Sequence, residues 1–165
     1  MKRFIAMTTV AATISLLLSA NPLSASHQQR SWFHVTQGSF ETLPGGEELG
    51  YDVQGRAKMV RTGHGDAGAT LVVVRVRGLD PRTTYPTHVH NKPCSATPPG
   101  GGHYQNVIGG PVDDVNEMWP AITTNKRGKG TSFAMHDAQA RLDAQSIVVH
   151  YPLDTSIRLA CLDLR

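Results

Sequence analysis

The sequence lacks two features that would indicate a helical or repetitive protein. No segment has the length and apolar spacing of a convincing helix, and no internal repeat is present. Glycine and proline, by contrast, number 16 and 10 and are scattered along the chain, which is typical of short strands joined by turns. A length of 165 residues suits one domain. We therefore expect a single domain built mainly of β-strands.

The sequence also lacks a strong excess of charge. It has 16 Lys and Arg residues against 13 Asp and Glu, and two of the basic residues, Lys2 and Arg3, stand at the very start of the chain. Without these two, the charges nearly balance. This composition gives no reason to expect a nucleic acid or a membrane surface as a partner.

The first residues have the pattern of a signal peptide. Lys2 and Arg3 precede a mostly apolar stretch, residues 4–18, that is too short to span a bilayer comfortably, and small residues follow at 19–20 and 24–26. The absence of cysteine from this segment does not fit a lipid-anchored precursor. We expect a signal peptide over residues 1–26, a mature domain over residues 27–165, and a secreted or periplasmic location.

Cysteine is scarce, and the mature chain would contain only Cys94 and Cys161. An even number of cysteines in an exported protein favours a disulfide. The bond would close a loop of roughly 70 residues, for which the chain-entropy model gives a stabilisation of about 4 kcal/mol. Two free buried thiols are the alternative.

The strand pattern is clearest over residues 69–79. There Val72, Val74 and Val76 alternate with Arg75 and Arg77, which predicts a half-buried antiparallel strand. Further strands are expected over 31–40, 57–60, around 87–90, and over 117–124, 131–135, 146–150 and 157–164, with loops over 43–55 and 92–102. Seven or eight short antiparallel strands predict a Greek-key β-sandwich or barrel.

Two histidines separated by one residue, His88 and His90, are the first candidate metal ligands. On a strand both point to the same side, whereas Val89 between them points to the other side and into a core. Alone this pair is a weak indication, because two exposed strand histidines give the same pattern. His103 follows three consecutive glycines that allow the backbone to fold back, and His150 ends an apolar strand.

Taken in order, these pieces resemble the copper/zinc superoxide dismutase family. The matching motifs are Gly78-Leu79-Asp80-Pro81, His88-Val89-His90, Cys94, Gly102-His103, Val148-Val149-His150 and Arg158-Leu159-Ala160-Cys161. Each motif alone is weak. The ordered set of four histidines, two cysteines and one arginine is specific.

The resemblance implies a role for each matching residue. The residues that match copper ligands are His88, His90, His103 and His150. His103 also matches the histidine that bridges copper to zinc, Cys94 and Cys161 match the family disulfide, and Arg158 matches the arginine that draws superoxide to the copper. Imidazole nitrogens suit copper, and a fixed guanidinium attracts a small anion. His103 and Arg158 are therefore the expected catalytic residues.

The chain departs from the family where zinc should bind. No histidine occurs over residues 104–130, and the carboxylates there are Asp113, Asp114 and Glu117. A zinc site with oxygen ligands alone would be unusual, so we expect zinc to be absent. Ligating histidines usually have a partner on the other ring nitrogen, and Glu117 is the first candidate to hydrogen-bond His103. The alternative is that Glu117 is a solvated loop charge.

The connection from His150 to Arg158 is also short, since it contains only residues 151–157 where the family carries a long charged loop. It should leave the copper open to solvent. Both departures resemble the copper-only branch of the family, and they also resemble inactive relatives. We expect an exported, copper-only superoxide dismutase that converts superoxide to oxygen and hydrogen peroxide. The alternatives are a copper-binding or copper-delivery protein of the same fold without turnover, and a structural domain without metal.

Overall fold

The computed structural model describes residues 33–165. The expected signal peptide, residues 1–26, and the first two residues of the strand expected over 31–40 lie outside the described residues. The strands are β1 (Phe33–Ser39), β2 (Glu41–Thr42), β3 (Gln54–Thr62), β4 (Ala69–Arg77), β5 (Thr84–Tyr85), β6 (Thr87–His90), β7 (Ile122–Thr123), β8 (Gly130–His136), β9 (Ser146–Tyr151) and β10 (Asp154–Asp163). Two short helices, α1 (Pro44–Glu48) and the 3-10 helix η1 (Gly65–Ala67), lie in connections. Among these described residues, no helix is long and apolar enough to cross a membrane.

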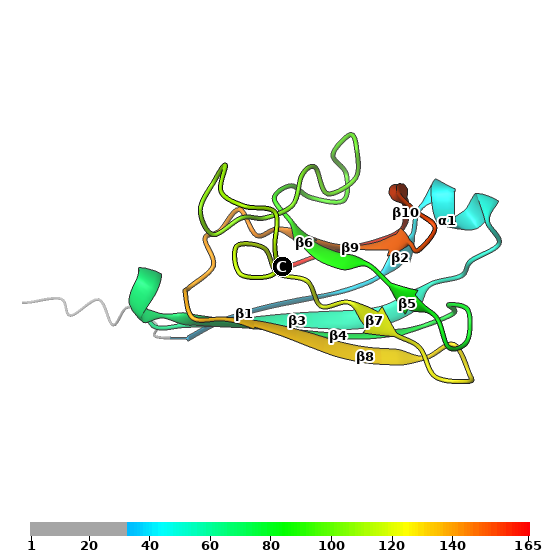
Figure 1. Cartoon of the computed structure of the whole chain (residues 1–165), viewed down its shortest axis with the longest axis horizontal. Helices are drawn as coiled ribbons and strands as arrows, with labels where there is room; N and C mark the ends of the chain where they lie inside the picture. Colours follow the sequence, from blue (N-terminus) through cyan, green and yellow to red (C-terminus); the bar gives the residue numbers. More distant parts are fainter. Residues whose placement is uncertain (1–32) are drawn as a thin grey trace, which may run out of the picture. The chain divides into compact units, whose positions relative to one another are not determined.

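Two four-stranded antiparallel sheets form the two layers of the fold (Figure 1). The first sheet has the order β1-β3-β4-β8 and the second the order β2-β10-β9-β6, while β5 and β7 pair in a small third sheet. The chain leaves the first sheet after β4, contributes β6 to the second, and returns as β8, which pairs with β4. This all-β sandwich confirms the predicted fold class, although residues 33–165 form ten strands and not seven or eight, because the two-residue strands β2 and β5 were not anticipated from the sequence.

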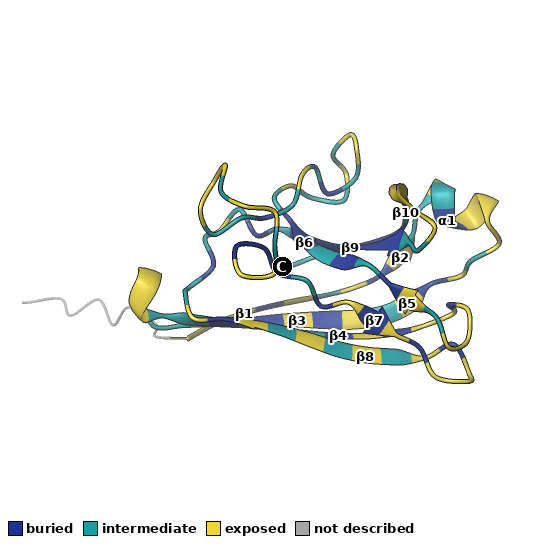
Figure 2. Ribbon diagram, viewed as in Figure 1, coloured by how far each residue is buried: buried dark blue, intermediate teal, exposed yellow. Residues whose placement is uncertain are grey.

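The alternation of side chains on β4 decides which face of the first sheet meets the core. Val72, Val74 and Val76 are at most 5% exposed, whereas Arg75 and Arg77 are exposed, as the sequence predicted. Val89 on β6 is fully buried in the same core. Figure 2 shows this alternation of buried and exposed residues along the strands. Burial of a valine side chain contributes about 1.5–3 kcal/mol, so this pattern anchors both sheets.

The long loop that follows β6 is fastened onto the second sheet. A disulfide joins Cys94 in the loop to Cys161 on β10, with Cα atoms 5.7 Å apart, which confirms the expected bond. Gly100 has a φ of +85°, and a Cβ atom there would lie 2.7 Å from the side chain of Val148 on β9. A glycine is therefore required for the loop to cross the sheet this closely.

Three expectations about local structure are wrong in detail. The strand expected over 117–124 is limited to β7, because Pro120 has no N–H to pair and Glu117 instead forms an isolated bridge with Gln105. The strand expected over 57–60 extends over all of β3, since β1 and β4 pair with it on both sides. The loop expected over 43–55 contains α1, which Pro44 begins.

Candidate metal centre

Four histidines from three separate segments form a cluster on the second sheet. The members are His88 and His90 on β6, His103 after the glycine run, and His150 on β9. Strands β6 and β9 are neighbours, so the period-two spacing on β6 and the end of β9 bring three of the rings together. His103 joins them through a backbone bridge to His90. The four sequence-predicted ligands are thus adjacent in space.

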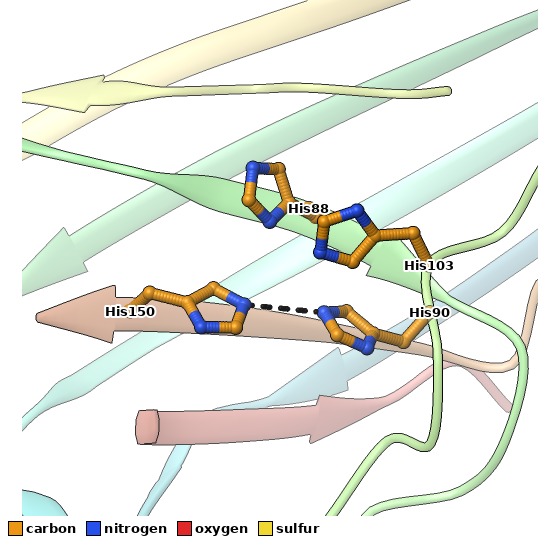
Figure 3. Close-up of side chains that lie close together, drawn as sticks. All are labelled: His88, His90, His103 and His150. Atoms are coloured by element: carbon orange, nitrogen blue, oxygen red, sulfur yellow. Dashed lines mark hydrogen bonds between the residues drawn. The ribbon is translucent and has the colours of Figure 1, made fainter. Parts of the chain in front are cut away.

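One ring nitrogen from each of the four histidines lies within 4.8 Å of the other three. Nε2 of His90 is 3.2 Å from Nε2 of His150, and the ring centroids of His88 and His103 are 4.1 Å apart. Figure 3 shows the four rings around a common centre, each with a nitrogen turned toward it. Within residues 33–165, no other group of three or more His, Cys, Asp or Glu side chains has this geometry.

Hydrogen bonds on the outer side fix the orientation of two of the strand histidines. Nδ1–H of His150 donates to the backbone carbonyl of Thr155 at 2.7 Å, and Nδ1–H of His90 donates to the carbonyl of Gly101 at 3.3 Å. A carbonyl oxygen can only accept, so the ring proton lies on Nδ1 in both residues. In both residues the lone pair on Nε2 therefore faces the cluster, and with both protons on Nδ1 neither Nε2 can donate across the 3.2 Å contact between them.

The other two histidines each present one free nitrogen in a different way. Nδ1–H of His103 donates to the carboxylate of Glu117 at 2.6 Å, so its Nε2 lone pair is free. Nδ1 of His88 is buried and has no hydrogen-bond partner. Buried polar atoms are rarely left without a partner, and a metal ion would supply one. All four residues therefore offer a nitrogen ligand.

Burial keeps the strand histidines of the cluster uncharged. It lowers the pKa of His88 to about 3, of His90 to about 2 and of His150 to about 4, because a desolvated imidazolium is unfavourable. Electrostatic repulsion from the neighbouring His103 lowers all three pKa values further, and so does Arg158 for His90 and His150. At neutral pH the three rings are neutral, which is the form that binds a metal.

Glu117 contacts His103 from within a network of hydrogen bonds and is only 1% exposed. Its Oε2 accepts from His103 and, at 2.9 Å, from the indole N–H of Trp119, while its Oε1 accepts from the side-chain amide of Gln105 at 3.0 Å. Burial raises the pKa of the carboxyl group, but the three hydrogen bonds outweigh burial and hold the pKa below its usual value. The carboxylate is therefore ionised and fixed, and it is not a solvated loop charge.

Sequence reasoning missed Gln105 and Trp119. The signal for Trp119 was its position two residues after Glu117, because side chains two apart lie on the same side of an extended segment. Gln105 gives no such signal, since it meets Glu117 only through the bridge between two loop segments. The carbonyl oxygen of the Gln105 side chain accepts from the backbone N–H of Gly109 at 2.9 Å, which leaves its amide nitrogen to face Glu117.

Arg158 lies on β10 opposite His150 in the strand register. Its guanidinium donates to the backbone carbonyls of Pro99 and Gly101, the second at 2.9 Å. Because the Gly101 carbonyl also accepts from His90, one loop oxygen connects the guanidinium to the cluster. The arginine is thus held beside the histidines by the loop that the disulfide fastens.

The cluster is open on the side of His103. The side chain of this residue is 30% exposed, although its partner Glu117 is buried. The connection expected over residues 151–157 is a tight hairpin, because β9 ends at Tyr151 and β10 begins at Asp154. No long loop is available there to cover the centre.

Comparison of the chain with protein-family models and with curated proteins found no match. Fold and site together define an all-β protein with a four-histidine centre that could bind a metal ion.

Proposed function

We propose that this protein is an exported, copper-dependent superoxide dismutase of the copper-only type. The observation that carries the proposal is the cluster of four histidines, His88, His90, His103 and His150, each with one free nitrogen. Such a nitrogen set suits copper, which also binds nitrogen ligands more tightly than the other divalent first-row metals. The buried, unpartnered Nδ1 of His88 fits a ligand atom. The disulfide agrees with an oxidising compartment outside the cytosol.

The network around Glu117 supports a centre without zinc. Glu117, Gln105 and Trp119 fill the region that follows His103, and Glu117 already provides the outer nitrogen of His103 with a partner. An ionised, buried carboxylate orients the ring much as carboxylates orient metal-ligating histidines in other proteins. No histidine occurs in residues 104–130 to add a second set of nitrogen ligands.

Bound copper would supply a one-electron couple, so that two superoxide ions and two protons become one oxygen and one hydrogen peroxide. The residues of the chain have three tasks in this reaction. Arg158 attracts the superoxide anion by its charge and does not hold the neutral products. His103 can carry a proton on Nε2 whenever that nitrogen is not a ligand. Glu117 keeps the His103 ring aligned and balances its positive charge.

Metal analysis of the purified mature chain, combined with an assay of superoxide consumption, tests the proposal. We expect one copper and no zinc per chain, and rapid turnover by the copper-loaded protein. His88→Gln should lose copper and activity, whereas His34→Gln, at an exposed position on β1, should retain both. Bound copper without turnover would favour a copper-binding or copper-delivery protein. Stoichiometric zinc, or no metal at all, would overturn the proposal.

A further inference from the structure

The outer face of the first sheet is divided along its strands into a cationic end and an apolar end. The register places Arg56 on β3 beside Arg75 on β4, and Val60 beside Leu71. The cationic end consists of Arg56, Lys58, Arg75, Arg77 and Lys129. The apolar end consists of Val35, Val60, Leu71, Val73, Phe133 and Met135. Alternation turns the strand residues of both sets away from the core, because Val72, Val74 and Val76 fill the inner face, and Lys129 lies in the turn before β8.

The apolar end includes exposed side chains on both edge strands of the sheet. Phe133 and Met135 on the edge strand β8 are 71% and 65% exposed, and Val35 on the opposite edge strand β1 is 36% exposed. Figure 2 shows exposed positions on β8, whereas the apolar residues Val60 on β3 and Leu71 and Val73 on β4 are half-buried. Contiguous apolar surface of this kind commonly marks a site of interaction with a protein or a membrane.

The cationic end has no acidic partner within the described part of the chain. None of its five residues forms a salt bridge. Four of them, Arg56, Arg75, Arg77 and Lys129, line a hollow of about 480 Å³, where Gly55 and Gly130 contribute no side chain. Arg77 donates a hydrogen bond to the side-chain oxygen of Gln54. Several cations without a salt bridge around one hollow can bind phosphate-like anions.

We propose that this face docks onto a membrane surface that contains anionic phospholipids. The cationic end binds phosphate groups of the lipids, and Phe133 and Met135 enter the boundary between headgroups and acyl chains. The proposal does not depend on the metal centre, whose four histidines belong to the second sheet and the loop after it.

Charge and polarity favour a lipid surface over other partners. A second copy of this chain would bring no carboxylate to the cationic end, because the outward positions of β1, β3, β4 and β8 include no Asp or Glu. A soluble polyanion such as a nucleic acid would pair with the cations but would leave Phe133, Met135 and Val35 in water. A surface of anionic lipids offers phosphate groups to the cationic end and acyl chains to the apolar end.

Vesicle binding by the full mature chain tests the proposal, with phosphatidylcholine vesicles compared with vesicles that also contain phosphatidylglycerol. We expect binding only to the anionic vesicles, and weaker binding as salt is added. Each cation near such a surface is worth about fivefold in affinity, so Arg75→Gln combined with Arg77→Gln should weaken binding about 25-fold. Phe133→Ser combined with Met135→Ser should weaken binding about tenfold or more.

Matched variants on the second layer provide the controls. Lys92→Gln removes an exposed cation from the loop after β6, and Leu153→Ser removes a side chain that is 84% exposed in the hairpin between β9 and β10. Neither should change vesicle binding by more than about twofold. A loss with Lys92→Gln as large as that with Arg75→Gln would show attraction by net charge alone, and a loss with Leu153→Ser as large as that with Phe133→Ser would show apolar contact outside this face. Either result would overturn the proposal.

Two further results would also overturn the proposal. One is binding of soluble dextran sulfate as tight as binding of anionic vesicles, with no effect of Phe133→Ser, which would indicate a soluble polyanion as partner. The other is an absence of vesicle binding together with a dimer in sedimentation equilibrium that Phe133→Ser dissociates, which would assign the face to a second copy of the chain. All substituted side chains are exposed, so thermal unfolding near that of the parent protein checks that each variant is folded.

Discussion

Replacement of Glu117 by glutamine removes one buried negative charge and leaves the volume of the side chain almost unchanged. The parent carboxylate accepts three hydrogen bonds, from His103 at 2.6 Å, Trp119 at 2.9 Å and Gln105 at 3.0 Å. A glutamine at this position has one acceptor oxygen and one NH₂ group. If the oxygen faces His103 and Trp119, the NH₂ group meets the amide nitrogen of Gln105, so two donors oppose each other.

The cost of this change follows from the loss of charge and from the unmatched donor. Hydrogen bonds to an ionised group are about twice as strong as neutral ones, and a buried group without a partner costs about 1–3 kcal/mol. Gln105 could rotate its amide to accept the new donor only by giving up its bond to the backbone N–H of Gly109. We therefore expect Glu117→Gln to lower the free energy of unfolding by about 1–3 kcal/mol.

Under the proposed function, Glu117→Gln should also slow superoxide turnover. Loss of a partner on a ligating histidine typically costs about 10- to 100-fold in metal affinity or activity. Copper should remain bound at one equivalent when it is supplied in excess, because the four ligating nitrogens are unchanged. The amide cannot balance positive charge on His103, so the loss of activity should be greatest at higher pH, where protons are scarce.

The assay is superoxide consumption across a pH series, with copper content measured on the same samples. Asp114→Asn is the matched control, since it makes the same chemical change in an exposed side chain of the same loop. An unchanged rate and pH profile in copper-loaded Glu117→Gln would refute the role of Glu117, whatever the stability of the variant. A slower rate in Asp114→Asn as well would point to a general effect on the loop.

The remaining predictions concern the disulfide, the arginine and the metal-free protein. Cys94 and Cys161 are 67 residues apart in the sequence, so reduction of their disulfide should lower the free energy of unfolding by about 4 kcal/mol. Reduction should also weaken copper binding before the domain unfolds. An unchanged affinity for copper in the reduced protein would contradict this. Arg158→Ala should lower the turnover rate and reduce its dependence on ionic strength, with copper still bound. Arg158→Lys should restore part of this salt dependence. Equal salt dependence in the parent protein and both variants would show that Arg158 does not attract the anion. The urea midpoint of the metal-free protein should fall as the pH is lowered from about 6.5 toward 4. In this range the histidines of the unfolded chain bind protons, whereas burial lowers the pKa values of His88, His90 and His150 in the folded protein to about 3, 2 and 4 and keeps their rings neutral. A constant midpoint over this range would contradict the assignment of neutral rings to these three residues.

Strands with strong alternation were predictable from the sequence, and strands set by their neighbours were not. On β4 three valines alternate with two arginines, so the sequence gives both the strand and its inner face. On β3 the outer positions include Arg56 and Lys58, and only the pairing with β1 and β4 extends the strand to nine residues. Local pattern is a weak guide where hydrogen bonds from two neighbours decide the length.

The cluster of four histidines was predictable from strand periodicity and from the order of the motifs. His88 and His90 needed only the period of two, and the other two histidines were reached by resemblance to a family of known site architecture. The support around the ligands was harder to predict. Gln105, which donates to the Glu117 carboxylate, and the carbonyl of Gly101, which accepts from Arg158, both lie in loops. The path of the loop that contains Gly101 depends on the disulfide and on Gly100.

The net charge of the chain gave no indication of the cationic end of the first sheet, on which the docking proposal depends. The chain as a whole has 16 basic and 13 acidic residues, and this near balance predicted no membrane partner. The pairing of β3 with β4, however, sets Arg56 beside Arg75, and the four strands of this sheet contain no acidic residue. An electrostatic interaction within a Debye length of about 8–10 Å responds to the charges on that face and not to the sum over the chain. A nearly neutral β-sandwich can therefore present a strongly cationic surface, and the sequence reveals it only after the register between strands is known.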